Sequence, residues 1–193
     1  ALSIVMLSGV TLDNAGLLTL SSGGTSTVQL ASFNNTGTVS VGFSTLRIVA
    51  DGADTGAYGL VSGGSVDFAG GTRTLAAASN PGGTGSFAVS GADVTLSDGG
   101  AGTLTLLPLT VNSGSLTVNG SGSLSLPTVN VPGGTLRLDG PAGVSLSPIL
   151  TLGSGVAGGA TLFINSGAPV VLNELFINGA IIDGAHEDRK SVV

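Results

Sequence analysis

Two carboxylates and a tyrosine give this chain its best candidates for chemistry. Asp51, Asp54 and Tyr58 lie close together in the segment 49–63, which interrupts a regular apolar pattern. Two nearby carboxylates can act as acid and base in glycoside hydrolysis, and a tyrosine beside them can contact a ligand. We expect the segment to be a loop that leaves a rigid scaffold, where binding residues are often placed. These three residues are therefore the candidate ligand contacts.

The aspartates also fit a purely structural role. Asp51, Asp98 and Asp139 each precede glycine, which is a turn signature. Asp93 with Asp98 is the other close pair of carboxylates, and Asp67 could project from a strand near either pair. None of these arrangements is a convincing catalytic constellation. The sequence therefore predicts a protein that is not an enzyme and names no catalytic residue.

Metal binding is also not expected. The chain has no cysteine, and therefore no thiolate metal site. The glycine-rich segments 82–87 and 99–104 begin like calcium-binding nonapeptide repeats, but Phe87 and Leu104 stand where the aspartate ligand belongs. We expect no metal and no cofactor.

Composition limits the kinds of partner. The 193 residues include only five Lys and Arg, the net charge is −6, and 8% of the chain is charged. A phosphate-binding face needs clustered basic residues, so nucleic acid is an unsuitable partner. No apolar run reaches the length of a membrane-spanning helix, so we expect no membrane insertion by this segment.

A fixed repeat in the sequence indicates the strands that must position these residues. When residues 104–163 are written in rows of 20, Leu104, Leu124 and Val144 share one column. Further columns contain Leu106, Leu126 and Leu146; Leu109, Val129 and Ile149; Val111, Val131 and Thr151; Leu116, Leu136 and Val156; and Val118, Leu138 and Gly158. Such a period, with short alternating apolar pairs, is typical of a solenoid.

Each row contains three triplets of apolar, polar and apolar residues, which alternate faces as a strand does. We therefore predict an all-β fold, a parallel β-helix with three short strands per coil. The repeat implies about 20–22 residues per coil and roughly nine coils. The segments 49–63 and 76–86 are predicted to be loops outside this coil.

The ends suggest a piece of a longer chain. Residue 1 is not methionine, and residues 188–193 match one translation frame of a widely used sequencing adapter. We expect a single solenoid domain over residues 1–187, followed by a non-native tail at 188–193. His186 borders that tail and is assigned no role.

Four segments resemble repeats of large bacterial surface proteins. They are FNNTGTVSV (33–41), GGSVDFAGGTRTL (63–75), GSLTVNG (114–120) and GGTLRLDG (133–140). The resemblance is to the filamentous-haemagglutinin and autotransporter-passenger type. It implies a right-handed β-solenoid stalk, secreted or anchored at the cell surface, that serves adhesion or display.

The leading hypothesis is therefore a structural, adhesin-like repeat segment of an exported bacterial protein. Its expected partners are glycans or surface proteins, together with flanking coils of its own chain. The rival is a carbohydrate-active β-helix module that binds or cleaves glycans. Ice binding is a minor alternative, because threonine pairs such as Thr72 with Thr74 resemble those of ice-binding solenoids but do not recur at the coil period.

Overall fold

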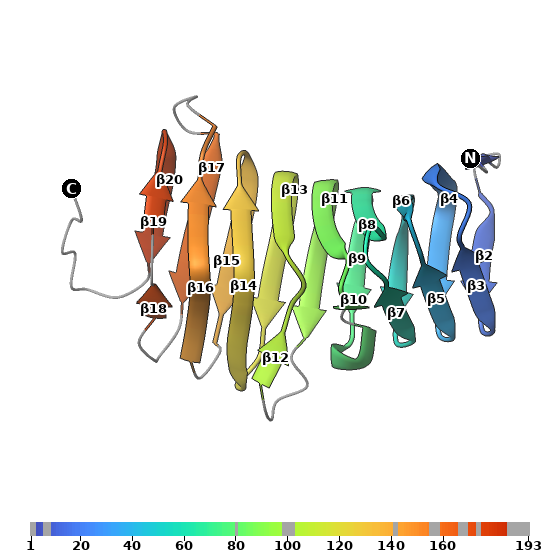
Figure 1. The fold of residues 1–193 in the computed structure, drawn as a ribbon, viewed down its shortest axis with the longest axis horizontal. Coiled ribbons are helices and arrows are strands. Elements are labelled where there is room, and N and C mark those ends of the chain that lie inside the picture. The colour runs from blue at the N-terminus through green and yellow to red at the C-terminus, as the bar shows by residue number, and fades with distance from the viewer. Residues whose placement is uncertain are drawn as a thin grey trace.

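The computed structural model describes residues 3–5, 9–79, 81–97, 103–140, 143–154, 159–165, 170–172 and 175–184. Nearly all of them lie in short strands that stack in parallel along one axis. Figure 1 shows these strands side by side, with β2 and β20 at opposite ends of the row. The predicted all-β solenoid is confirmed.

Within the described residues, the strands form two sheets. The larger has 16 strands: β1 (Ser3–Val5), β2 (Thr11–Asn14), β4 (Gly24–Asn35), β6 (Ser44–Asp54), β8 (Ser65–Gly70), β9 (Thr72–Leu75), β11 (Ser86–Ser97), β12 (Thr103–Thr105), β13 (Leu109–Asn119), β14 (Ser123–Val131), β15 (Gly134–Asp139), β16 (Gly143–Leu152), β17 (Ala160–Asn165), β18 (Val170–Leu172), β19 (Leu175–Ile177) and β20 (Ala180–Gly184). The smaller has four: β3 (Leu17–Leu20), β5 (Thr38–Val41), β7 (Ala57–Leu60) and β10 (Pro81–Gly83). A 3-10 turn, η1, covers Ala77–Ser79.

Pairing within the larger sheet follows the repeat. Its longest path runs β1-β4-β6-β8-β11-β13-β14-β16-β18, so each strand pairs with one from a later lap of the chain. β11 pairs with both β8 and β9, which means that one continuous strand bends across two faces of the coil. The coils therefore have the three predicted strand segments. Some neighbouring segments are joined into one longer strand, because the chain bends at the corner without leaving the β conformation.

The central columns lie largely as predicted. Leu104 pairs in register with Leu124, and Leu124 with Val144. The column that begins Leu109 and Val129 continues to Leu150 instead of Ile149.

One extra residue in β16 explains this difference. Leu126 pairs with Leu146, but Thr128 pairs with Ile149, so the register shifts around Pro148. A bulge accommodates proline because the residue there makes no ladder hydrogen bond. The same shift places Leu152, not Thr151, beside Val131.

Two other columns end differently from the prediction. Leu136 pairs with Leu162 rather than Val156, and Leu138 pairs with Ile164 rather than Gly158. The spacing from Leu136 to Leu162 is 26 residues, because the connection between β16 and β17 is longer than a fixed 20-residue row allows. A strict period therefore fails where a connection lengthens.

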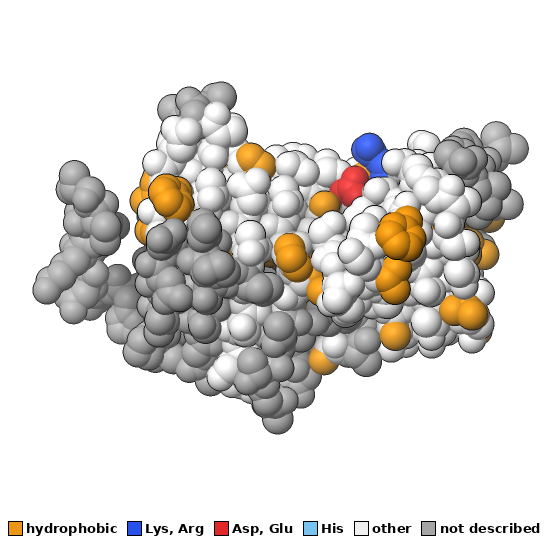
Figure 2. Space-filling view, viewed as in Figure 1, with side chains coloured by type: hydrophobic (Ala, Val, Ile, Leu, Met, Phe, Trp, Pro, Cys, Tyr) orange, Lys and Arg blue, Asp and Glu red, His pale blue; other side chains and the backbone are white. Residues whose placement is uncertain are grey.

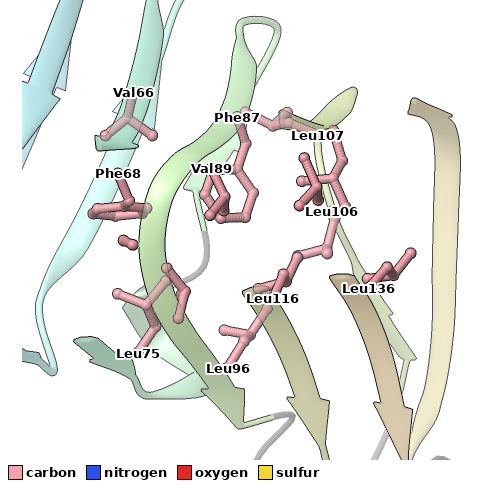
Figure 3. Packing of buried hydrophobic residues seen from close by; sticks show 14 of the residues in the cluster. Val66, Phe68, Leu75, Phe87, Val89, Leu96, Leu106, Leu107, Leu116 and Leu136 are labelled. Atoms are coloured by element: carbon pink, nitrogen blue, oxygen red, sulfur yellow. The ribbon is translucent and has the colours of Figure 1, made fainter. Parts of the chain in front are cut away.

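The core runs along the inside of the coil. Inward positions of successive strands are mostly buried aliphatic side chains, with a few aromatic rings among them. Figure 3 shows Val66, Phe68, Phe87 and Val89 beside Leu106 and Leu116 in one continuous interior. Phe68 and Phe87 meet edge to face, with ring centroids 5.6 Å apart. Each layer thus removes the apolar surface of its neighbours from water.

The prediction of two loops is wrong. The segment 49–63 contains the end of β6 and all of β7, and 76–86 contains η1 and β10. The N–H groups of Thr55 and Gly56 both donate to the carbonyl of Asn35. The corner one lap earlier has the same pattern, since Thr36 and Gly37 both donate to the carbonyl of Asn14. The apolar pattern breaks here because a polar group is buried, and the chain stays within the coil.

Candidate functional site

The structure separates the three residues that the sequence groups together. Asp51 is exposed at the surface of β6. Asp54 and Tyr58 point into the coil, where they are 1% and 2% exposed. Side chains alternate along a strand, so Asp51 and Asp54, three positions apart, face opposite sides. A ligand on the outer surface can reach only Asp51 of the three.

Asp54 forms a buried ion pair with Arg73 of β9. The Arg73 Nη2 lies 2.6 Å from the Asp54 Oδ2, and both side chains are 0% exposed. The Tyr58 hydroxyl donates to the same oxygen at 2.9 Å. The backbone N–H of Asn35 donates to the Asp54 Oδ1 at 2.7 Å. The carboxylate therefore accepts three hydrogen bonds, which compensate for the loss of water.

The Arg73 guanidinium has further partners within the core. Its Nη2 donates to the carbonyl of Phe33 at 2.8 Å, and its Nη1 to that of Ala50 at 3.3 Å. The guanidinium carbon lies 5.6 Å from the ring centre of Phe33 and 5.2 Å from that of Phe68, within reach of cation–π attraction. Only the Nε of this side chain has no partner among the described residues.

Gly52 makes room for this guanidinium. It pairs with Arg73 in the sheet, and a side-chain carbon at Gly52 would lie 2.8 Å from each terminal guanidinium nitrogen. The same carbon would lie 2.1 Å from the carbonyl oxygen of Phe33. The Asp-Gly dipeptide that the sequence suggests as a turn signature is therefore a strand position that must lack a side chain.

Burial sets the ionisation of Tyr58. Its pKa is raised well above the usual value of 10.0, first by desolvation and then by the negative charge of Asp54. The phenol therefore remains a donor to the carboxylate at neutral pH. A neutral, fully bonded tyrosine in this position stabilises the charge of Asp54 and performs no proton transfer with solvent.

Asp54 ends a short internal ladder of polar side chains. The Asn14 Nδ2 donates to the Asn35 Oδ1 at 2.8 Å, and the Asn35 Nδ2 donates to the carbonyl of Ala57 at 3.1 Å. Asn14, Asn35 and Asp54 each stand two residues before a glycine. The sequence therefore has the motif Asn/Asp-x-Gly at these three positions, with spacings of 21 and then 19 residues. This repeated motif could have predicted that the three side chains stack inside the coil, whereas the spacing of Asp51 and Asp54 could not.

The glycines of this motif stack as well. A side-chain carbon at Gly37 would lie 2.2 Å from the carbonyl oxygen of Gly16, and one at Gly56 would lie 2.1 Å from that of Gly37. Backbones of successive laps therefore approach too closely at this corner for any side chain. The motif is a structural requirement of the corner.

Asp51 caps a backbone group on the outer face. Its Oδ1 accepts the N–H of Thr72 at 2.8 Å. Because Asp54 is enclosed with Arg73, the two carboxylates cannot act together on a substrate. The pairing of Asp51 with Asp54 as acid and base is therefore incompatible with the structure.

The outer face of β9, β11 and β13 carries two rows of oxygen-bearing side chains. Thr72 pairs with Asp93, which pairs with Ser115. Thr74 pairs with Thr95, which pairs with Thr117. Single threonines thus align in one row, but a carboxylate and a serine replace threonine in the other row. The pair Thr72 with Thr74 is therefore not repeated on the next two coils.

Charged side chains on the surface are mostly tied to neighbours. The Ser90 hydroxyl donates to both carboxylate oxygens of Asp67, at 2.6 and 2.8 Å. Arg137 forms an ion pair with Asp139, which raises the pKa of Arg137, and its guanidinium carbon lies 4.2 Å from the ring centre of Phe163. On the face shown in Figure 2, a red and a blue side chain lie next to each other, and the rest of the described surface there is largely uncharged.

Within the described residues, no group of three or more His, Cys, Asp or Glu side chains is placed to hold a metal ion. No helix in that part of the chain is long and apolar enough to cross a membrane.

Comparison of the chain with protein-family models, curated proteins and solved structures found no match. The tail 188–193 and His186 lie outside the described residues.

Proposed function

We propose that this chain is a structural stalk, a surface repeat segment of an exported bacterial protein that serves display or adhesion. The observation that carries the proposal is the unbroken series of parallel pairings along the axis, from β1 to the last strands. Each lap adds backbone hydrogen bonds and apolar contact to the next, which yields a rod held by the same interactions throughout its length.

The surface of the rod supports the same role. Many of its outward side chains are hydroxyls and amides. Asp51 and Asp67 bond to neighbouring laps, and Arg137 pairs with Asp139 of its own strand. Within the described residues, the Asp54–Arg73 ion pair lies inside the coil, where it serves packing. Such a surface interacts little with polyanions or with itself, as a spacer outside a cell requires.

The test is where the protein is found. Antibodies raised against the purified chain are applied to intact cells of the organism that carries the gene, with and without protease treatment. We expect labelling of intact cells that protease removes. Labelling that requires permeabilised cells would contradict both the display role and the proposed extracellular or cell-surface location.

A mechanical measurement examines the rod itself. Pulling on the two termini of a single molecule should release the chain in small, similar steps, because each lap contacts only its neighbours. A lap of about 20 residues releases roughly 70 Å of extended chain. A single release of the whole contour length would argue against independent laps.

A further inference from the structure

The corner between β5 and β6 contains an aromatic residue in a conformation that favours glycine. Phe43 has a φ of 51°, the only positive φ among the described residues other than glycine. A bulky L-residue is strained in this left-handed region, because its β-carbon approaches the backbone.

The neighbouring laps show what the corner itself prefers. Gly23 lies before β4 and Gly63 before β8, with φ values of 72° and 78°. A side-chain carbon at Gly63 would lie 3.1 Å from the Phe43 ring and 3.7 Å from the Phe43 Cα, so the two corners are stacked. The Gly23 N–H donates to the Ser44 hydroxyl at 3.1 Å, which places the earlier corner directly beside this one.

The corner at Phe43 is also the shortest of the three. Three residues separate Val41 from Thr45, whereas four separate Leu60 from Ser65, although Val41 pairs with Leu60 and Thr45 with Ser65. All three corners take the left-handed conformation, which glycine adopts without strain. Packing does not explain the phenyl group, since Phe43 is 72% exposed.

The segments that form the three stacked corners are apolar or hydroxyl-bearing. Val61, 49% exposed, lies on the next lap, 3.1 Å from where a side chain at Gly42 would begin. Exposed serines occupy the adjoining corners, at Ser21, Ser22 and Ser62. The segments 20–26, 41–46 and 60–66 contain no Asp, Glu, Lys, Arg or His.

We propose that the corner formed by Phe43, Val61 and the flanking serines is a binding site for a neutral saccharide. The C–H face of a sugar ring stacks on an exposed phenyl group, and hydroxyl groups at its edge exchange hydrogen bonds with serines. Strained residues persist where function retains them, and exposed aromatic rings are frequent anchors of recognition. The absence of charge in these segments favours a neutral ligand over an anionic one. The inference deepens the proposed function by naming the chemistry of an adhesive contact.

The experiment measures binding of the whole chain to an array of neutral and anionic glycans, followed by titration of the glycans that bind. We expect binding to neutral glycans, reduced at least about tenfold by Phe43→Gly, as for loss of an aromatic anchor. The midpoint of denaturant unfolding should not fall in this variant, because glycine suits the corner. Phe43→Tyr should retain binding.

Leu17→Ala is the matched control, because Leu17 is 69% exposed but lies in an ordinary strand, β3. It should leave binding unchanged. Phe43→Asn serves as a second variant if Phe43→Gly lowers stability, since asparagine tolerates the left-handed region. No binding of neutral glycans by the parent chain, or undiminished binding by both Phe43→Gly and Phe43→Asn, would overturn the site. Neither outcome changes the cell-surface test of the stalk, so the two proposals fail separately.

Discussion

Two parts of the coil solve the same packing problem with different interiors. In the laps of residues 103–165, the described inward positions are aliphatic, as Leu116, Leu136 and Leu162 illustrate. In the laps of residues 9–79, the interior also contains an asparagine ladder that ends in the Asp54–Arg73 pair. The backbone pairing is parallel in both.

The comparison indicates that a charged interior fixes the register in which successive laps pair. Aliphatic layers can slide by one lap with little loss, because one leucine resembles another. An ion pair with a dedicated glycine opposite it, Gly52, fits in only one register. We therefore expect this buried ion pair to discriminate against other registers of pairing more than it adds to stability.

The largest effect should follow from breaking the ion pair. Asp54→Asn leaves the buried Arg73 guanidinium without a counter-charge, and we expect a loss of about 3–5 kcal/mol in the free energy of unfolding. Denaturant unfolding measures the loss, and hydrogen exchange should place it in the laps of residues 9–79. Asp51→Asn is the control, since that exposed carboxylate makes one cap to Thr72, and its loss should stay near or below about 1 kcal/mol.

A double variant sharpens this prediction. Asp54→Leu combined with Arg73→Met should cost less than the sum of the two single changes, because neither charge is then left unpaired. Additive losses would show that the two side chains act independently, in conflict with the 2.6 Å contact.

In the aliphatic part, Leu136→Ala should cost about 3 kcal/mol. The side chain is 0% exposed and lies between Leu116 and Leu162, so its removal leaves a cavity. Hydrogen exchange should accelerate in the adjoining laps and leave those near Asp54 protected, because each lap contacts only its neighbours. Equal acceleration in both parts would mean that the coil unfolds as one unit.

Gly52→Ala is expected to cost about 1–3 kcal/mol, since the new methyl group meets the Phe33 carbonyl and the Arg73 guanidinium. Gly59→Ala is a suitable comparison, because its nearest neighbour would be 4.0 Å away. Thermal unfolding of the two variants measures the difference. Similar melting temperatures would show that the Phe33 carbonyl and the Arg73 guanidinium move aside for the new methyl group at little cost in stability.

The smallest effect is a dependence on alkaline pH. Below about pH 10 the Tyr58 phenol is protonated in both states, and its contribution to stability is complete. Above that pH the unfolded chain releases the proton, while the raised pKa keeps the folded phenol protonated. The free energy of unfolding should therefore fall by about 1.4 kcal/mol per pH unit until the folded pKa is reached.

Tyr58→Phe isolates this effect, because Tyr58 is the only tyrosine of the chain. Comparison of the two proteins between pH 9 and 11 should show the extra slope in the parent alone. Parallel curves would contradict the raised pKa.

The sequence predicted the fold better than it predicted the site, for reasons visible in particular residues. Leu104, Leu124 and Val144 align because a period carries its information in many repeated positions. Ile149 and Val156 were misplaced because a single extra residue or a longer connection leaves no mark in side-chain type. Asp54 and Tyr58 were expected in a loop, because a charge inside an apolar pattern looks like an interruption when its partner is 19 residues away.

By itself, the sequence determined the parallel coil, since alternation and period are local properties that survive small errors in register. Only the tertiary structure decided that Asp54 faces Arg73 inside the core, that Gly52 is the space for the guanidinium, and that Phe43 stands strained at an exposed corner. The physical reason is that these features depend on contacts between successive laps. A shift of one residue in the pairing turns an inward side chain outward, and the pattern of residue types does not record such a shift.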